Sequence, residues 1–140
     1  MANTALNTTP IYTASGDTQW AISATTANTT KDASSGTLYT VFTASSTGGY
    51  VQRLRLKPLG TNVATVARVF LNNGSANTTA ANNVLWDEVS LPATTISETS
   101  ALPTFEIPMN IALPAGYKIY VTMATGVAAG YSITAVGGKY

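Results

Sequence analysis

Apolar and polar residues alternate along most of this chain, and turn-rich stretches separate the alternating runs. Alternation with a period of two is typical of β-strands that bury one face. The stretches between the runs are rich in Gly, Pro, Asn and Ser, which favour turns. The pattern predicts eight strands, at residues 18–23, 37–43, 50–59, 63–71, 84–91, 105–113, 117–124 and 131–136.

The same pattern gives little support to helices, and residues 76–86 are the best helical candidate. Eight short antiparallel strands with some long connections predict an all-β fold, an antiparallel two-sheet sandwich or jelly roll. In the strand at 84–91, Leu85, Val89 and Leu91 are expected to share one face. The core is expected to include Leu54, Leu56, Val69, Leu71, Ile119 and Val121.

The chain divides into a short arm and one domain. Residues 1–10 are polar and end at Pro10, so we expect an N-terminal arm followed by a single β-sandwich domain at 11–140. The arm has two interpretations, a frayed terminus or a segment that becomes ordered on a partner. In the second case Asn3, Thr4 and Leu6 would contact that partner. The first residues lack the basic and apolar regions of a signal peptide, so export by such a peptide is not expected.

One strand carries a patterned charge. At 50–59, Leu54 and Leu56 point to one face, while Arg53, Arg55 and Lys57 point to the other. This basic row is either a solvated outer face or a docking stripe for an acidic protein surface. A second strand, at 105–113, contains Pro108, which is typical of an edge strand or a bulge.

Composition narrows the classes of partner. Only 9% of the 140 residues are charged and the net charge is +1, far from the basic excess of nucleic-acid-binding proteins. No apolar run approaches the length of a membrane span. We therefore expect neither nucleic acid nor membrane as partner. A weakly charged surface has little to repel a neighbouring protein, which favours assembly.

The residue types that carry most catalysis are missing. The chain has no His and no Cys, which removes the commonest general base and the commonest transition-metal ligands. Asp87 and Glu88 are neighbours on a strand and point to opposite faces, so they cannot face one substrate together. The polar loop with Asn28, Asp32 and Ser34 is read as solvated rather than calcium-binding. We expect a protein without enzymatic activity, cofactor or metal.

The aromatic residues permit one alternative function. Aromatic side chains scattered through strands are usually core residues or cross-strand pairs, but together they could form a platform on which sugars stack. The residues considered for such a platform are Trp20, Trp86, Tyr39, Tyr120 and Tyr131.

Two segments resemble small virion proteins of tailed bacteriophages. Residues 113–140 (LPAGYKIYVTMATGVAAGYSITAVGGKY) contain a Leu-Pro-x-Gly-Tyr turn, a Val-Ala-Ala-Gly-Tyr hairpin and a Gly-Gly-x-Tyr end. Residues 51–74 (VQRLRLKPLGTNVATVARVFLNNG) lead from an Arg-Leu-Arg strand into Arg-Val-Phe-Leu-Asn-Asn-Gly. Together they cover about a third to a half of the chain. The resemblance is to the capsid decoration, or cement, type.

The resemblance implies a β-sandwich on the capsid surface of the virion, made in the host cytoplasm, that bridges subunits of the major capsid protein, often as a homotrimer. Scarce charge and one candidate edge guarded by Pro108 also favour a homo-oligomer, because unguarded strand edges pair with other chains. Two alternatives stay open: a tail or fibre-associated virion protein, and a carbohydrate-binding module.

Overall fold

The computed structural model describes residues 13–22 and 24–140. The described residues form nine strands and one short 3-10 helix. In chain order these are β1 Ser15–Gly16, β2 Gln19–Ala21, β3 Tyr39–Thr43, β4 Gly49–Pro58, β5 Thr65–Asn72, η1 Ala80–Asn82, β6 Asn83–Leu91, β7 Phe105–Leu113, β8 Lys118–Met123 and β9 Tyr131–Lys139.

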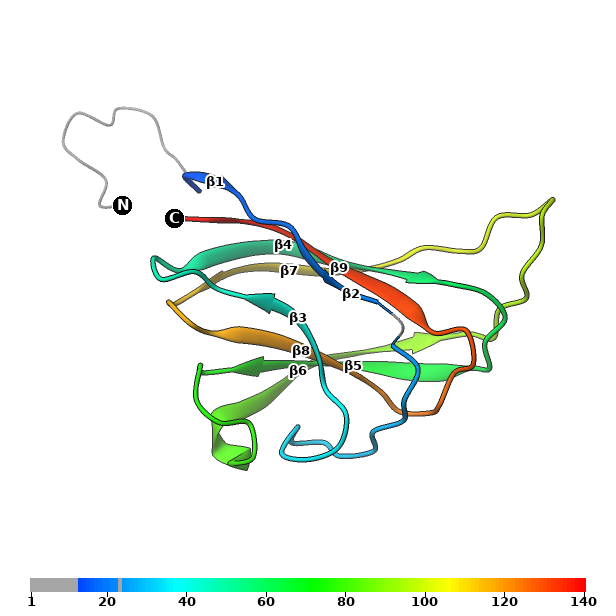
Figure 1. The fold of residues 1–140 in the computed structure, drawn as a ribbon, viewed down its shortest axis with the longest axis horizontal. Helices are drawn as coiled ribbons and strands as arrows, with labels where there is room; N and C mark the ends of the chain where they lie inside the picture. The colour runs from blue at the N-terminus through cyan, green and yellow to red at the C-terminus, as the bar shows by residue number, and fades with distance from the viewer. Residues whose placement is uncertain (1–12, 23) are drawn as a thin grey trace.

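The strands form two antiparallel sheets that face each other as the layers of a sandwich (Figure 1). The five-stranded sheet has the order β1-β9-β4-β7, with β2 also paired to β9, and the four-stranded sheet has the order β3-β8-β5-β6. The pairs β2–β9, β3–β8, β4–β7 and β5–β6 are nested. This nesting is what results when one long antiparallel ribbon is folded over itself, and it is typical of a jelly roll.

The alternating pattern predicted eight of the nine described strands and missed β1, whose two residues are both exposed. Each of the eight expected runs overlaps one strand, and the one at 105–113 matches β7 from end to end. β7 lies at an edge of its sheet, which confirms the prediction from Pro108. The helical candidate at 76–86 was wrong, because that segment holds only the η1 turn and the beginning of β6.

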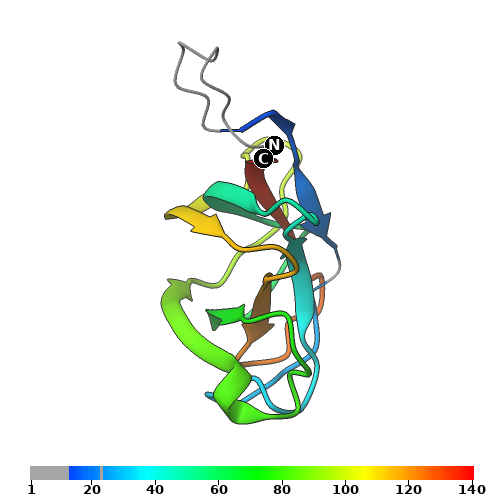
Figure 2. The ribbon, with the colours of Figure 1, turned by 90° about the vertical axis from the view of Figure 1, so that its left-hand side faces the viewer.

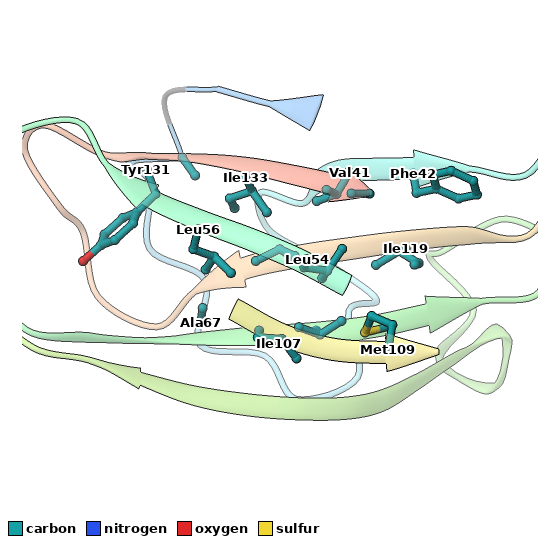
Figure 3. Packing of buried hydrophobic residues seen from close by; sticks show 14 of the residues in the cluster. Val41, Phe42, Leu54, Leu56, Ala67, Ile107, Met109, Ile119, Tyr131 and Ile133 are labelled. Carbon is teal, nitrogen blue, oxygen red and sulfur yellow. The ribbon is translucent and has the colours of Figure 1, made fainter. Parts of the chain in front are cut away.

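The core lies between the two sheets and is built from the inward-facing residue of each alternating pair (Figure 3). Leu54 and Leu56 of β4 are fully buried, as are Ile119 and Val121 of β8. Val69 of β5 is also buried. These five expected core residues are confirmed. Leu71 was also expected to be buried, but it is only partly buried, because it lies near the end of β5 and packs against the margin of the core.

A bulge corrects the expectation for β6. The register of β5 and β6 shifts between the pairs Val69↔Asp87 and Phe70↔Leu85, which leaves Trp86 as an extra residue. An extra residue interrupts the alternation, so the residues before the bulge point to the opposite face from the one that an unbroken period of two predicts. Leu85 therefore packs on the outer face against Phe70, while Val89 packs against the main core.

The outer face of the four-stranded sheet is covered by the chain's own polar loop between β2 and β3. Ala33 from this loop is fully buried and forms a small second core with Phe70 and Tyr120. The Asn77 and Asn83 side chains donate hydrogen bonds to the carbonyl oxygens of Ala33 and Asp32. Figure 2 shows η1 at the far end of the molecule from the C-terminus, which lies at the five-stranded sheet.

Candidate functional site

The candidate site is the outer face of the five-stranded sheet around Arg53, Arg55 and Lys57, here called the basic face. All three side chains come from β4, which lies inside the sheet between β9 and β7. Leu54, Leu56 and Pro58 are buried on the opposite side of the strand, so the three cations project outward as the alternation predicted. They form one row along the strand.

The three cations differ in their partners. Arg53 Nε lies 3.5 Å from Glu106 Oε1 of β7. Lys57 Nζ donates to the carbonyl oxygen of Leu102 and lies 3.4 Å from Thr104 Oγ1. Arg55 has no ion pair or hydrogen bond among the residues that the structure describes, and it is exposed. Arg55 is therefore the cation that is most available to a partner.

An exposed tryptophan lies beside this row. Trp20 of β2 is paired with Thr134 of β9, and Thr134 is paired with Arg55 of β4. The three residues thus lie in one line across the sheet, with the Cα atoms of Trp20 and Arg55 about 10 Å apart by the usual strand spacing. The Trp20 side chain is 64% exposed, as is Ile22 two residues further along.

The basic face is hollowed at its end near the C-terminus. A shallow cavity of about 410 Å³ is lined by Thr13, Tyr50, Gln52, Val136, Gly137 and Gly138. It lies where the register of β4 against β9 shifts between Val51 and Arg53, next to Arg53 in the row. Two consecutive glycines leave this part of the surface without side chains.

The five aromatic residues that could have formed a sugar platform are separated. Trp20 lies on the basic face, while Trp86 is on edge strand β6 of the other sheet. Tyr120 is buried under the polar loop, and Tyr131 is fully buried in the main core. The hydroxyl oxygen of Tyr39 accepts hydrogen bonds from the amides of Thr25 and Thr26, at 3.0 and 2.9 Å.

The polar loop over the four-stranded sheet is held by charge as well as by packing. Arg68 of β5 donates from Nε to Glu88 Oε1 at 2.7 Å and from a terminal nitrogen to the carbonyl oxygen of Asn28 at 3.3 Å. Lys31 Nζ of the loop lies 3.5 Å from the same Glu88 oxygen. The hydrogen bond from Arg68 holds the pKa of Glu88 below its ordinary value, and the positive charge of Lys31 adds to this.

This contact predicts a pH dependence of stability. A lowered pKa means that the ionised Glu88 stabilises the fold above its ordinary pKa of 4.5, and that this contribution is lost as the pH falls through the lowered value. We expect Glu88→Gln to lower the melting temperature slightly at neutral pH, and the difference from wild type to shrink in acid. Thermal melts between about pH 2 and pH 7 measure this. A difference that does not change with pH would contradict it.

The side chains of Asn28 and Asp32, which were considered for metal binding, form hydrogen bonds within the loop. Asn28 is buried, and its amide nitrogen donates to the carbonyl oxygens of Ser35 and Thr37. Asp32 Oδ1 accepts from the amide and hydroxyl of Ser34, at 3.0 and 2.7 Å, and the pKa of Asp32 is lowered by these bonds. Within the described ranges no three Asp, Glu, His or Cys residues gather as metal ligands would.

None of the helical segments described has the length and apolarity to cross a membrane.

Part of the expected contact set cannot be placed. Asn3, Thr4 and Leu6 of the arm lie outside the described residues. Trp20, by contrast, was underestimated, because aromatic residues in strands were expected to be mostly core or cross-strand pairs. The alternation of Trp20 and Ile22 with Ala21 was a usable signal, since it places both large residues on the face opposite a small one.

Comparison with known proteins does not assign the chain to a family: no family model matches it, and no curated protein or solved structure shows a significant similarity to it.

Proposed function

We propose that this chain is a structural virion protein that decorates a tailed-phage capsid and stabilises the shell by bridging neighbouring subunits of the major capsid protein. It would act on the capsid surface, as a homo-oligomer and most simply as a trimer. The resemblance of residues 51–74 and 113–140 to small phage virion proteins supplies the biological setting. Jelly rolls occur in viral capsid domains and also in lectins, so the fold suits this role without selecting it.

The observation that carries the proposal is the difference between the two outer faces. The four-stranded sheet is covered by the chain's own loop, which buries Phe70 and Tyr120. In the described part of the chain, that loop leaves Trp86 exposed only on edge strand β6, whereas the five-stranded sheet presents Trp20 and the exposed Arg55 together, with Arg53 and Lys57 partly exposed beside them. Trp and Arg are the residue types enriched at the energetic centres of protein interfaces. A face of this kind is suited to binding another protein.

Binding alone would suffice for such a role. A protein interface of standard size, about 1,600 Å² in total, can hold a complex tightly without chemistry. On a shell with many equivalent positions, an oligomer that contacts several subunits gains further from multivalency. Shell stability then rises because the bound protein favours the intact shell over the opened one.

Copy number in purified virions tests the placement. Mass spectrometry of particles of the phage that encodes the chain should find on the order of hundreds of copies, as repeated contacts on a shell require. A handful of copies would instead place the protein on the tail or a fibre. Its absence from virions would refute the proposal and bring the sugar-binding alternative forward.

The basic face should contribute to shell binding through its charge. We expect Arg53→Glu combined with Arg55→Glu to weaken binding to stripped particles, and to do so more at low salt than at high salt, because exposed charges are screened. Removal of residues 1–10 should also weaken binding while leaving the melting temperature unchanged. Sedimentation of particles with the purified variants measures both effects. If both variants bind like wild type, these contact sites are wrong.

A further inference from the structure

Trp20 is exposed although its strand is firmly held. β2 has three residues, and Ala21 packs against the main core while Trp20 points away from it. The Trp20 indole makes no hydrogen bond or ring contact within the described ranges. Tryptophan carries a large apolar surface, and leaving most of it in water forgoes the free energy of burial. Trp86 is exposed in a strand as well, so what points to an interface at Trp20 is its exposure together with its place on the basic face, in line with Arg55.

The neighbouring residue holds the backbone that carries this side chain. Gln19 bridges the two sheets, because its amide nitrogen donates to the carbonyl oxygen of Thr43 in β3 and its amide oxygen accepts from the Thr43 amide, both at 2.9 Å. The Gln19 nitrogen also lies 3.1 Å from a carboxylate oxygen of Asp17. Backbone pairing with β9 holds the other side of β2. A side chain presented by a rigid backbone loses less conformational entropy on binding.

The charge next to Trp20 indicates what it meets. Arg55, two strands away on the same line, is the cation of the basic face that is unpaired in the described part of the chain. Arg53 forms an ion pair with Glu106, and Lys57 is directed to the loop oxygens of Leu102 and Thr104. A partner that covers Trp20 would desolvate Arg55 as well, which is favourable only if it supplies an acidic group there.

We propose that Trp20 is the anchor of the partner contact, and that the partner is a protein surface with an apolar recess for Trp20 and a carboxylate that faces Arg55, whose Cα lies about 10 Å from that of Trp20. This inference rests on the proposed function and names the chemistry of the surface it requires. A stacking platform for sugars would need further aromatic rings nearby. The other exposed tryptophan, Trp86, belongs to the opposite sheet, and Tyr50 of the same face pairs with Gly138, four residues along β9 from the partner of Trp20.

Two matched tryptophan variants test the proposal. Trp20→Thr removes the anchor and keeps a good strand-forming residue, while Trp86→Thr makes the same change at a comparably exposed site on β6. Because anchor residues typically account for a large share of binding, we expect Trp20→Thr to weaken binding to stripped particles by about 30-fold or more. Trp86→Thr should bind like wild type. Thermal melts of both variants check that neither result comes from unfolding.

A third variant and a sugar screen complete the test. Arg55→Gln should weaken particle binding less than Trp20→Thr, and its effect should diminish with salt. Equal binding of wild type and Trp20→Thr to the particles would overturn the role of Trp20 as anchor, while the proposed function would stand. Binding of a glycan array that depends on Trp20 would overturn the protein partner in favour of sugar. If wild type does not bind particles at all, the proposed function fails and this inference fails with it.

Discussion

Leu54→Ala is expected to lower the free energy of unfolding by about 2–5 kcal/mol, because it leaves a cavity in a core that cannot fully collapse around it. Leu54 is fully buried, and it lies in the central part of β4, which pairs with β9 on one side and β7 on the other. The core cluster that contains Leu54 includes residues of both sheets, so we expect the whole domain to be destabilised. Urea denaturation measures it.

Leu59→Ala is the matched control. Leu59 lies directly after β4 and is 46% exposed, so the same truncation removes fewer buried contacts there. We expect its unfolding midpoint to remain close to that of wild type. Similar losses for the two variants would contradict the assignment of β4 to the core.

Gly137→Ala is expected to destabilise the protein by about 3 kcal/mol, at the upper end of the usual cost of overpacking. A Cβ atom at Gly137 would lie 2.2 Å from the carbonyl oxygen of Tyr50 and 3.2 Å from its carbonyl carbon. These are backbone atoms of the neighbouring strand at its bulge, so no side-chain rotation can relieve the clash. Either β4 or β9 must shift.

The control for this variant is Gly16→Ala. Among the described residues other than its two chain neighbours, no atom lies within 4 Å of a Cβ built at Gly16, and its φ is not positive, so these surroundings do not require a glycine. Calorimetric melts should show a large loss for Gly137→Ala and almost none for Gly16→Ala. If Gly137→Ala has the same melting temperature as wild type, the close approach of β9 to β4 is wrong.

The period of two was sufficient to predict β2 to β9, but it predicted neither β1 nor the bulges in the strands. The other eight strands were found because burial of one face requires alternation in the sequence, whereas both residues of β1 are exposed and gave no such pattern. The extra residue at Trp86 depends on how β6 meets β5, which is a long-range pairing, so Leu85 was assigned to the wrong face. The burial of Phe70 depends on a loop that crosses its outer face, which no local pattern reveals.

The candidate site was predictable to a similar degree. The row at Arg53, Arg55 and Lys57 followed from alternation alone, and β4 presents it as expected. What distinguishes the three cations is the neighbouring chain: Glu106 of β7 reaches Arg53, and Leu102 reaches Lys57. The line from Trp20 through Thr134 to Arg55 required the register of three strands that are distant in sequence.

The most direct test of the capsid proposal is the thermal stability of the shell itself. Virions stripped of the protein should release their DNA at a lower temperature than intact virions, and added wild-type protein should restore the original release temperature by mass action. Trp20→Thr, added at the same concentration, should restore much less. The account would be contradicted if stripped and intact virions released DNA at the same temperature, or if added wild-type protein left the stripped shells unchanged.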